Sequence, residues 1–212
     1  MDVLFNVVGI VVYVALALLA LWGAFCAVIV WRRVGQVRFS DEEEQEEFLT
    51  ELDGTLGQGN YAEAVALCEE DRRALPQLAL FSIENREIGI GKLQRRLWER
   101  FQQDVLSDIE HRLSWVATVV KSAPMVGLFG TVLGMMGAFR SIATSEGGAD
   151  PTTMAGNIML ALITTACGLA IAVPLLIVTN SIVVRIRKME DLVGLGIGRL
   201  IETLKLAFGR SR

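Results

Sequence analysis

Histidine and cysteine, the side chains behind most metal sites and disulfide frameworks, are scarce in this chain of 212 residues. His111 is the only histidine and stands in a charged stretch, which favours a solvated surface position over a metal ligand. Cys26, Cys68 and Cys167 lie far apart, and two of them fall in apolar runs, where a thiol behaves as a small apolar side chain. We therefore expect no metal site, no disulfide and no cofactor.

Catalytic constellations and phosphate-binding loops are also missing. Ser141 and Ser181 have no histidine partner within reach by pattern, and the paired acidic residues lie on predicted solvated faces. The cluster of Gly54, Gly57 and Gly59 lacks the GxGxxG or GxxxxGK[ST] spacing of a nucleotide-binding loop. We expect neither an enzyme nor a nucleic-acid partner.

Charge is absent from three long stretches, although 21% of all residues are charged. Residues 3–31, 122–139 and 151–184 contain no Asp, Glu, Lys or Arg. Each stretch is close to the roughly 20 residues that a helix needs to cross about 30 Å of hydrocarbon. The first stretch has no basic segment before it and is too long for the core of a signal peptide, so we interpret it as a retained helix. Three membrane spans are predicted.

Basic residues near the ends of spans are retained on the cytoplasmic side and so predict the orientation. They follow the first and third spans, as Arg32, Arg33 and Arg38 and as Arg185, Arg187 and Lys188. We therefore expect a periplasmic N-terminus and a cytoplasmic C-terminus in a bacterial inner membrane. The expected parts are span 1 (1–31), a cytoplasmic helical segment (32–112), span 2 (113–140), a short periplasmic loop (141–152), span 3 (153–184) and a cytoplasmic C-terminal helix (185–212).

Two helical features are predicted in the cytoplasmic segment. The three glycines interrupt one helix, and residues 61–68 resume strong helix propensity before Pro76, which indicates a helical hairpin. From residue 83 to residue 139, apolar residues recur at spacings of three to five and predict one long amphipathic helix that enters the membrane without a stop. The members of this stripe are Ile88, Leu93, Leu97, Phe101, Val105, Ile109, Leu113 and Val116.

The two cytoplasmic parts carry opposite charge. Residues 32–112 hold 11 basic and 18 acidic residues, whereas residues 185–212 hold 7 basic and 3 acidic residues. Opposite charges on one side of the membrane favour packing of the two parts together. The tail also offers an apolar stripe to the long helix, made of Leu192, Leu195, Ile197, Leu200, Ile201, Leu204 and Phe208. No segment has the pattern of a strand.

Small residues form a row in the second span. Gly127, Gly130, Gly134 and Gly137 are spaced three, four and three, which places them on one helix face. Such a face lets another helix backbone approach closely in lipid. On their own the glycines predict helix contact and not conduction.

Three threonines lie near mid-span. Thr131 belongs to the second span, and Thr164 and Thr165 belong to the third. One threonine can satisfy its hydroxyl on its own helix, but threonines at similar depth on two spans would form a polar stripe facing the interior of a bundle. Asn157 and Asn180 extend the polarity toward the ends of the third span, and Pro124 and Pro174 are expected to shape the two helices.

Two runs of sequence resemble family signatures. The run APMVGLFGTVLGMMGAF (123–139) resembles the AP-x-x-GLLGTV-x-G-x-x-x-x-F signature of ExbB and TolQ, and ALITTACGLAIAVP (161–174) resembles their AL-x-x-TA-x-GL-x-x-A-x-P signature. Asn180 matches the asparagine that follows the second run. The chain is thus similar to the ExbB/TolQ/MotA proton-channel family, and it resembles a divergent member of the ExbB/TolQ type.

The resemblance implies an all-α membrane protein that forms a pentamer of long helices. The pentamer would enclose the membrane helices of a dimeric partner of the ExbD/TolR/MotB type, a single-span protein whose intramembrane aspartate carries the proton. Thr131 and Thr165 correspond to the channel-lining threonines of the family, and Thr164 is expected beside them. The sequence departs from the pattern at Leu160, where the family has glutamate, and at Leu133, where tryptophan is usual. MotA, with four spans, fits less well.

No Asp, Glu or His lies within the three predicted spans. A threonine hydroxyl does not ionise near neutral pH, so a proton relay through this chain needs a carboxylate from elsewhere. We expect a proton-channel subunit of a motor that couples the proton-motive force to work at the cell envelope. Two alternatives stay open: a helical membrane scaffold that conducts nothing, and a secondary transporter subunit, which would have broken helices or internal repeats around a midplane site.

Overall fold

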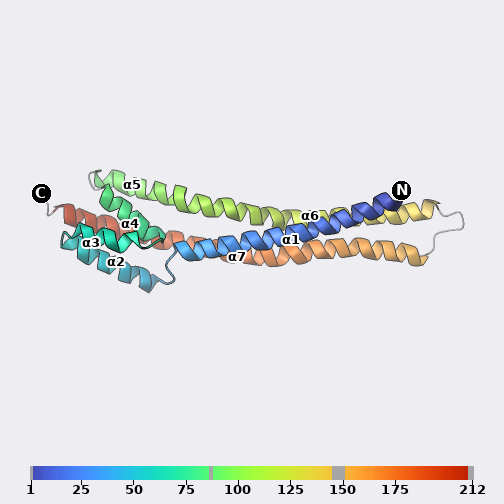
Figure 1. Cartoon of the computed structure of the whole chain (residues 1–212), viewed down its shortest axis with the longest axis horizontal. Helices are drawn as coiled ribbons and strands as arrows, with labels where there is room; N and C mark the ends of the chain where they lie inside the picture. The colour runs from blue at the N-terminus through green and yellow to red at the C-terminus, as the bar shows by residue number, and fades with distance from the viewer. Residues whose placement is uncertain (1, 86–87, 145–150, 210–212) are drawn as a thin grey trace. The chain divides into compact units, whose positions relative to one another are not determined.

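The computed structural model describes residues 2–85, 88–144 and 151–209, and these residues form helices without any strand. The all-α class is therefore confirmed for this part of the chain. The elements are α1 (Asp2–Val37), α2 (Glu42–Gly57), α3 (Tyr61–Glu69), α4 (Ala74–Glu84), α5 (Ile90–Arg100), the π-helical turn η1 (Phe101–Leu106), α6 (Ser107–Thr144) and α7 (Pro151–Gly209) (Figure 1). Three helices are long and apolar enough to cross a membrane, and their apolar parts lie in α1, α6 and α7.

The chain divides into two compact units that share these three long helices. The apolar unit comprises Met1–Ile29 and Arg112–Asn180, and the polar unit comprises Val30–His111 and Ser181–Arg212. The apolar unit holds the three uncharged stretches almost whole, and the polar unit holds α2 to α5.

In the apolar unit, α1 and α7 run parallel and α6 runs antiparallel to both (Figure 1). A Cβ atom built on Gly23 of α1 would lie 2.6 Å from Leu175 of α7 and 2.9 Å from Val119 of α6, so all three helices meet there. Large apolar side chains cover the outer faces, with Leu21 of α1 70% exposed and Met125 of α6 69% exposed. Such an apolar exterior is typical of helices that face lipid.

In the polar unit, α2 and α3 form a helical hairpin. Gly54 and Gly57 lie inside α2, and Gly59 alone takes the left-handed backbone of the turn, with a φ of 75°. The Asn60 side chain caps α3 by accepting a hydrogen bond from the Glu63 amide at 3.4 Å. Pro76 does not end a helix but lies in the first turn of α4, where a missing amide hydrogen costs nothing.

The long helix begins at Ile90 and not at residue 83. α4 ends at Glu84, and Asn85 follows it as the C-cap, with its side-chain amide donating to the Phe81 carbonyl at 2.9 Å. Asparagine competes with the backbone for hydrogen bonds, which favours the end of α4 at this residue, and Gly89 stands as the N-cap before α5. The expected continuity into the apolar unit holds only from Ile90 onward.

The end of α7 lies against the other helices of the polar unit, as the opposite charges predict. Arg199 donates to Asp53 of α2 at 2.8 Å, and the buried Gln45 amide donates to the Leu192 carbonyl at 2.8 Å. Leu192, Ile197, Leu200, Ile201 and Leu204 are buried as expected. Leu195 is 68% exposed, so its place in the stripe was wrong, and the side chain of Phe208 lies outside the described part.

Several ionisable groups of the polar unit have shifted pKa values, among them Cys68 and Glu44. Burial, with a smaller contribution from Asp71, raises the pKa of the Cys68 thiol to about 12, so this thiol stays neutral near pH 7. The Ser40 amide donates to the Glu44 carboxylate at 3.0 Å, and together with Arg73 it lowers the pKa of Glu44. Both groups belong to the packing of the unit.

The π-helical turn keeps the apolar stripe of the long helix on one face. Leu93, Leu97 and Phe101 follow each other at four-residue steps, but the next buried residue, Leu106, comes five positions after Phe101. On an α-helix a step of five would leave Leu106 about 140° away from Phe101. The i→i+5 hydrogen bonds of η1 add one residue to the turn, so that Leu106 and then Ile109 return to the buried face.

Deletion of Gln103, an exposed residue of η1, is expected to close the π-turn into an α-turn and to leave the stripe in phase. Deletion of the equally exposed Gln94 cannot be compensated in this way, because one part of the stripe must leave the buried face. Either Leu93 leaves the stripe, or the π-turn closes and Leu97 and Phe101 leave it, at a cost of about 2–5 kcal/mol for each large side chain lost from the core.

Thermal unfolding of the purified protein in detergent micelles measures the difference. The Gln103 deletion should unfold close to the wild-type temperature, and the Gln94 deletion well below it. Equal destabilisation by the two deletions would mean that the π-turn does not serve to keep the stripe in phase.

Candidate functional site

The backbones of α6 and α7 approach each other closely along the glycine row. A Cβ atom on Gly127 would lie 2.7 Å from the Thr164 carbonyl oxygen, and one on Gly134 would lie 2.5 Å from the Ala161 Cβ. On the facing helix, a Cβ atom on Gly168 would lie 2.6 Å from the Ala123 carbonyl oxygen. Only glycine fits at these three positions. We call this contact the α6–α7 seam.

Gly130 occupies the middle of the seam, where α1 also contacts α6. A Cβ atom there would lie 2.6 Å from the Thr164 hydroxyl oxygen and 3.0 Å from a methyl group of Val12. Gly137, the fourth member of the row, is half-buried. The row thus places threonines of α7 against α6 and leaves room for α1 at the same level.

The three threonines come together in the seam. The Oγ1 atoms of Thr131 and Thr165 are hydrogen-bonded to each other, and the Thr131 Oγ1 also lies 3.1 Å from the Ala161 carbonyl oxygen. The Thr164 Oγ1 lies 2.9 Å from the Gly127 carbonyl oxygen and 2.7 Å from the Ala161 carbonyl oxygen. These hydroxyls therefore connect α6 to α7.

The threonines differ in how far they are covered. Thr164 is 5% exposed and Thr131 is 8% exposed, whereas Thr165 is half-buried. Thr164 points into the seam and bonds the carbonyl of the opposite helix. Thr165 is the member of the group that also reaches an accessible edge.

The other expected residues lie away from this cluster. By helical rise, Asn157 stands about two turns before Thr164, and Asn180 stands about four turns after Thr165. Asn157 is half-buried and Asn180 is exposed. Pro124 and Pro174 lie inside α6 and α7, which continue through them as helices.

Tyr13 of α1 joins the same turn of α7 and was not found by the sequence reading. Its hydroxyl donates to the Leu160 carbonyl at 3.3 Å. The turn from Leu160 to Thr165 thus receives hydroxyl groups from α1 and from α6. A signal existed in the sequence, because Tyr13 carries the one hydroxyl group in residues 3–31.

The chemistry of this cluster is limited to neutral hydrogen bonds. Hydroxyl and carbonyl groups can orient water and bond a carboxylate, but they do not hold a proton near neutral pH. Among the described residues, no group of three His, Cys, Asp or Glu side chains is placed to hold a metal ion. The cluster needs an ionisable guest to move a proton.

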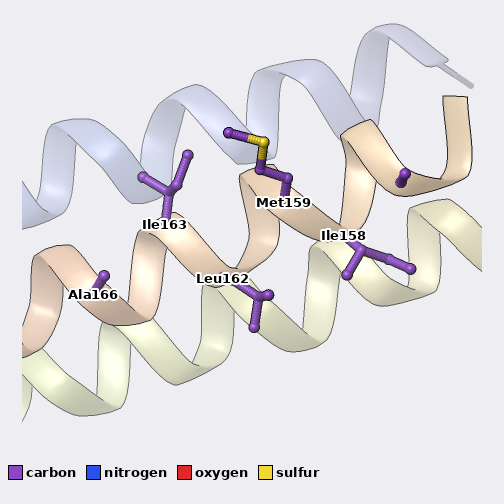
Figure 2. Close-up of a pocket in the computed structure, with 6 residues that line it drawn as sticks. Ile158, Met159, Leu162, Ile163 and Ala166 are labelled. Atoms are coloured by element: carbon purple, nitrogen blue, oxygen red, sulfur yellow. The ribbon is translucent and has the colours of Figure 1, made fainter. Parts of the chain in front are cut away.

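An open apolar groove of about 540 Å³ lies on the neighbouring face of α7. Its lining residues are Ala155, Ile158, Met159, Leu162, Ile163 and Ala166. Figure 2 shows Met159 and Ile163 pointing to the side of α1 and Leu162 pointing to the side of α6. The groove offers no polar group to a small ligand, so it suits contact with lipid or with another apolar helix.

Three apolar helices that are long enough to cross a membrane, with a cluster of hydroxyl groups where they meet, are typical of a multi-pass membrane protein. The profile of the MotA/TolQ/ExbB proton channel family matches residues 83–193, which include the seam and both ends of α6. The chain therefore belongs to the MotA/TolQ/ExbB proton channel family. The family and the three apolar helices together support a place in the inner membrane.

Individual relatives are similar to part of this chain. The chain is 39% identical over 106 residues to the biopolymer transport protein ExbB of Helicobacter pylori, which is 50% of this chain and 71% of that protein. It is 47% identical over 72 residues to the Tol-Pal system protein TolQ of Pseudomonas aeruginosa, which is 34% of this chain and 31% of that protein. It is 36% identical over 110 residues to TolQ of Haemophilus influenzae, which is 50% of this chain and 46% of that protein.

Substitution Gly127→Ala is expected to destabilise the apolar unit by about 1–3 kcal/mol, because the added methyl group meets a backbone carbonyl that cannot rotate away. Gly156→Ala is the matched control, since a Cβ atom there has nothing within 4 Å. The control should be neutral or slightly stabilising, because alanine favours the helix. Thermal unfolding in micelles compares the two, and equal melting temperatures would contradict the close approach.

Substitution Tyr13→Phe is expected to lower stability by about 0.5–1.5 kcal/mol, the usual contribution of one hydrogen bond. Hydrogen exchange of the backbone in residues 160–165 should rise, because one carbonyl of that turn loses a donor. Val14→Ala on the same helix removes exposed apolar atoms and no hydrogen bond, so it should leave that exchange unchanged. Unchanged exchange in the Tyr13→Phe protein would exclude the link.

Proposed function

We propose that this chain is the channel-forming subunit of a motor complex of the ExbB–ExbD or TolQ–TolR type, which couples the proton-motive force to work at the cell envelope. The observation that carries the proposal is the hydroxyl pair Thr131–Thr165 at the α6–α7 seam of a protein that belongs to a proton channel family. The names of the relatives, biopolymer transport and Tol-Pal system, agree with such work.

The proton carrier in this proposal is a carboxylate from a partner. The spans of this chain contain hydroxyl groups and no acid, so the partner is a single-span protein of the ExbD or TolR type with an intramembrane aspartate. Several copies of this chain, five in the family resemblance, surround the partner helices. One proton that descends 100 mV releases about 2.3 kcal/mol, which is enough to change partner contacts step by step.

The three threonines take different roles in this proposal. Thr165 lines the path, because it is half-buried and reaches an accessible edge. Thr131 holds the Thr165 hydroxyl in place through their hydrogen bond. Thr164 serves the seam itself, because it is buried and bonds the Gly127 carbonyl. For Thr164 we therefore propose packing of the seam in place of the expected position on the path.

The orientation stays as the basic residues predict it. Arg32 and Arg185 follow the first and third uncharged stretches. Both chain segments of the polar unit therefore lie in the cytoplasm, and the loop between α6 and α7 lies in the periplasm. The polar unit would then form the cytoplasmic part of the assembly. Leu160 removes the glutamate of the family, and the path past this turn depends on hydroxyl and carbonyl groups alone.

A non-conducting scaffold is the second candidate, and one observation favours it. The hydroxyls of Thr131 and Thr164 already have partners within the chain, so packing alone accounts for them. A secondary transporter has no comparable support, because α6 and α7 continue as helices through Pro124 and Pro174 and the broken helices of such proteins are not found in them.

The test replaces single hydroxyl groups by methyl groups in the complex of this chain with its single-span partner, reconstituted in liposomes. Proton uptake driven by a potential is measured for Thr165→Val, Thr131→Val and, as matched control, Thr179→Val, whose hydroxyl bonds only the Leu175 carbonyl of its own helix at 2.7 Å. Thr165→Val removes a hydrogen bond to an ionised group, about 1.5–3 kcal/mol, and should slow uptake about tenfold or more. Thr131→Val removes the bond that holds the Thr165 hydroxyl in place, so it should slow uptake as well.

The control variant should conduct at the wild-type rate. Thr164→Val should lower the melting temperature and reduce uptake only as far as it reduces assembly. Wild-type uptake by correctly assembled Thr165→Val and Thr131→Val complexes would rule out the channel role of these hydroxyls, and the absence of uptake by the assembled wild-type complex would support the scaffold.

A further inference from the structure

Two uncharged stretches of the chain end side by side in the polar unit. The first cation after the stretch in α1 is Arg32, directly after Trp31, and the first cation after the stretch in α7 is Arg185. The Arg185 guanidinium lies over the Trp31 ring, 3.9 Å from its centre. Because both stretches change from apolar to basic at this contact, it marks one level at which hydrocarbon ends and headgroups begin.

Exposed cations gather at this level. Arg32 is exposed, and Lys188 is exposed one turn after Arg185 on the same side of α7. The nearby Arg33 is already paired with Asp108 at 3.3 Å. We call Trp31, Arg32, Arg185 and Lys188 the Trp31 patch.

A phosphate diester fits this patch better than a carboxylate or a soluble acidic protein does. The stack on the indole orders the Arg185 guanidinium, which can then present parallel N–H donors to two phosphate oxygens, and Lys188 adds a point charge. Trp31 is 38% exposed, and an indole at this level prefers the boundary between hydrocarbon and water. Val184, directly before Arg185, is 66% exposed and offers apolar surface for an acyl chain.

We propose that the Trp31 patch binds the headgroup of an anionic phospholipid, with Arg185 and Lys188 on the phosphate and an acyl chain against Val184 of the same helix. Clusters of basic residues at the cytoplasmic end of a span attract anionic lipid with about 1 kcal/mol per side chain. The site requires neither proton conduction nor the partner protein.

Arg187 provides a matched control on the same helix. It is exposed, but it stands about 200° around the helix from Arg185 and so lies outside the patch. Removing its charge changes the net charge of the protein as Lys188→Gln does, without touching the patch.

The experiment measures lipid affinity of the full-length protein in neutral detergent by native mass spectrometry and by thermal stabilisation. The added probes are phosphatidylglycerol, phosphatidylcholine and inorganic phosphate. Phosphatidylglycerol should bind and stabilise the wild-type protein and Arg187→Gln equally. The double variant Arg185→Gln/Lys188→Gln should bind it about 30-fold more weakly, from the loss of two such charges. Lys188→Gln alone, at an exposed position, keeps the test valid if the double variant does not fold, and should bind about fivefold more weakly.

Three results would overturn the proposal. The first is equal binding of phosphatidylcholine and phosphatidylglycerol to the wild-type protein. The second is a loss in Arg187→Gln as large as in Lys188→Gln, which would mean that only net charge matters. The third is equal stabilisation by inorganic phosphate, which would make the patch a site for a soluble anion and not for lipid.

Discussion

Helices in lipid gain little from the hydrophobic effect when they meet, so the contact between α6 and α7 depends on close packing and on hydrogen bonds. The glycine row allows the close packing, and the threonine hydroxyls make the hydrogen bonds. Each needs the other: the Thr164 hydroxyl reaches the Gly127 carbonyl at 2.9 Å because residue 127 has no side chain. The position of Thr165, and with it the proposed path, follows from this contact.

The polar unit solves the corresponding problem with charged and amide groups. There the end of α7 is held by Arg199 on Asp53 and by the buried Gln45 amide on the Leu192 carbonyl. An apolar stripe supplies the stabilisation, and the polar bonds select one register of α7 against α2, because a shift by one residue would leave a buried amide without its acceptor. The same helix, α7, is thus held by hydroxyl groups in the apolar unit and by charged and amide groups in the polar unit.

Local patterns were enough to predict much of this protein. The three spans follow from the absence of charge, and the glycine and threonine positions follow from their spacing. Features that depend on a neighbour could not be predicted. Thr164 and Thr165 are adjacent in sequence, yet about 100° of helix rotation decides which one enters the seam. The exposure of Leu195 and the bond of Tyr13 to Leu160 likewise depend on where another helix passes.

The glycine row also limits how this protein can change. Glycine is the smallest residue, so every substitution at Gly127 or Gly134 adds atoms and pushes the helices apart. Substitutions at these two positions can therefore only increase the distance between α6 and α7. Compensation on the facing helix is restricted too, because Ala161 has only a methyl group to lose and a smaller residue than Thr164 would give up its hydroxyl. This region should accept new sequence more slowly than the lipid-facing surface around it.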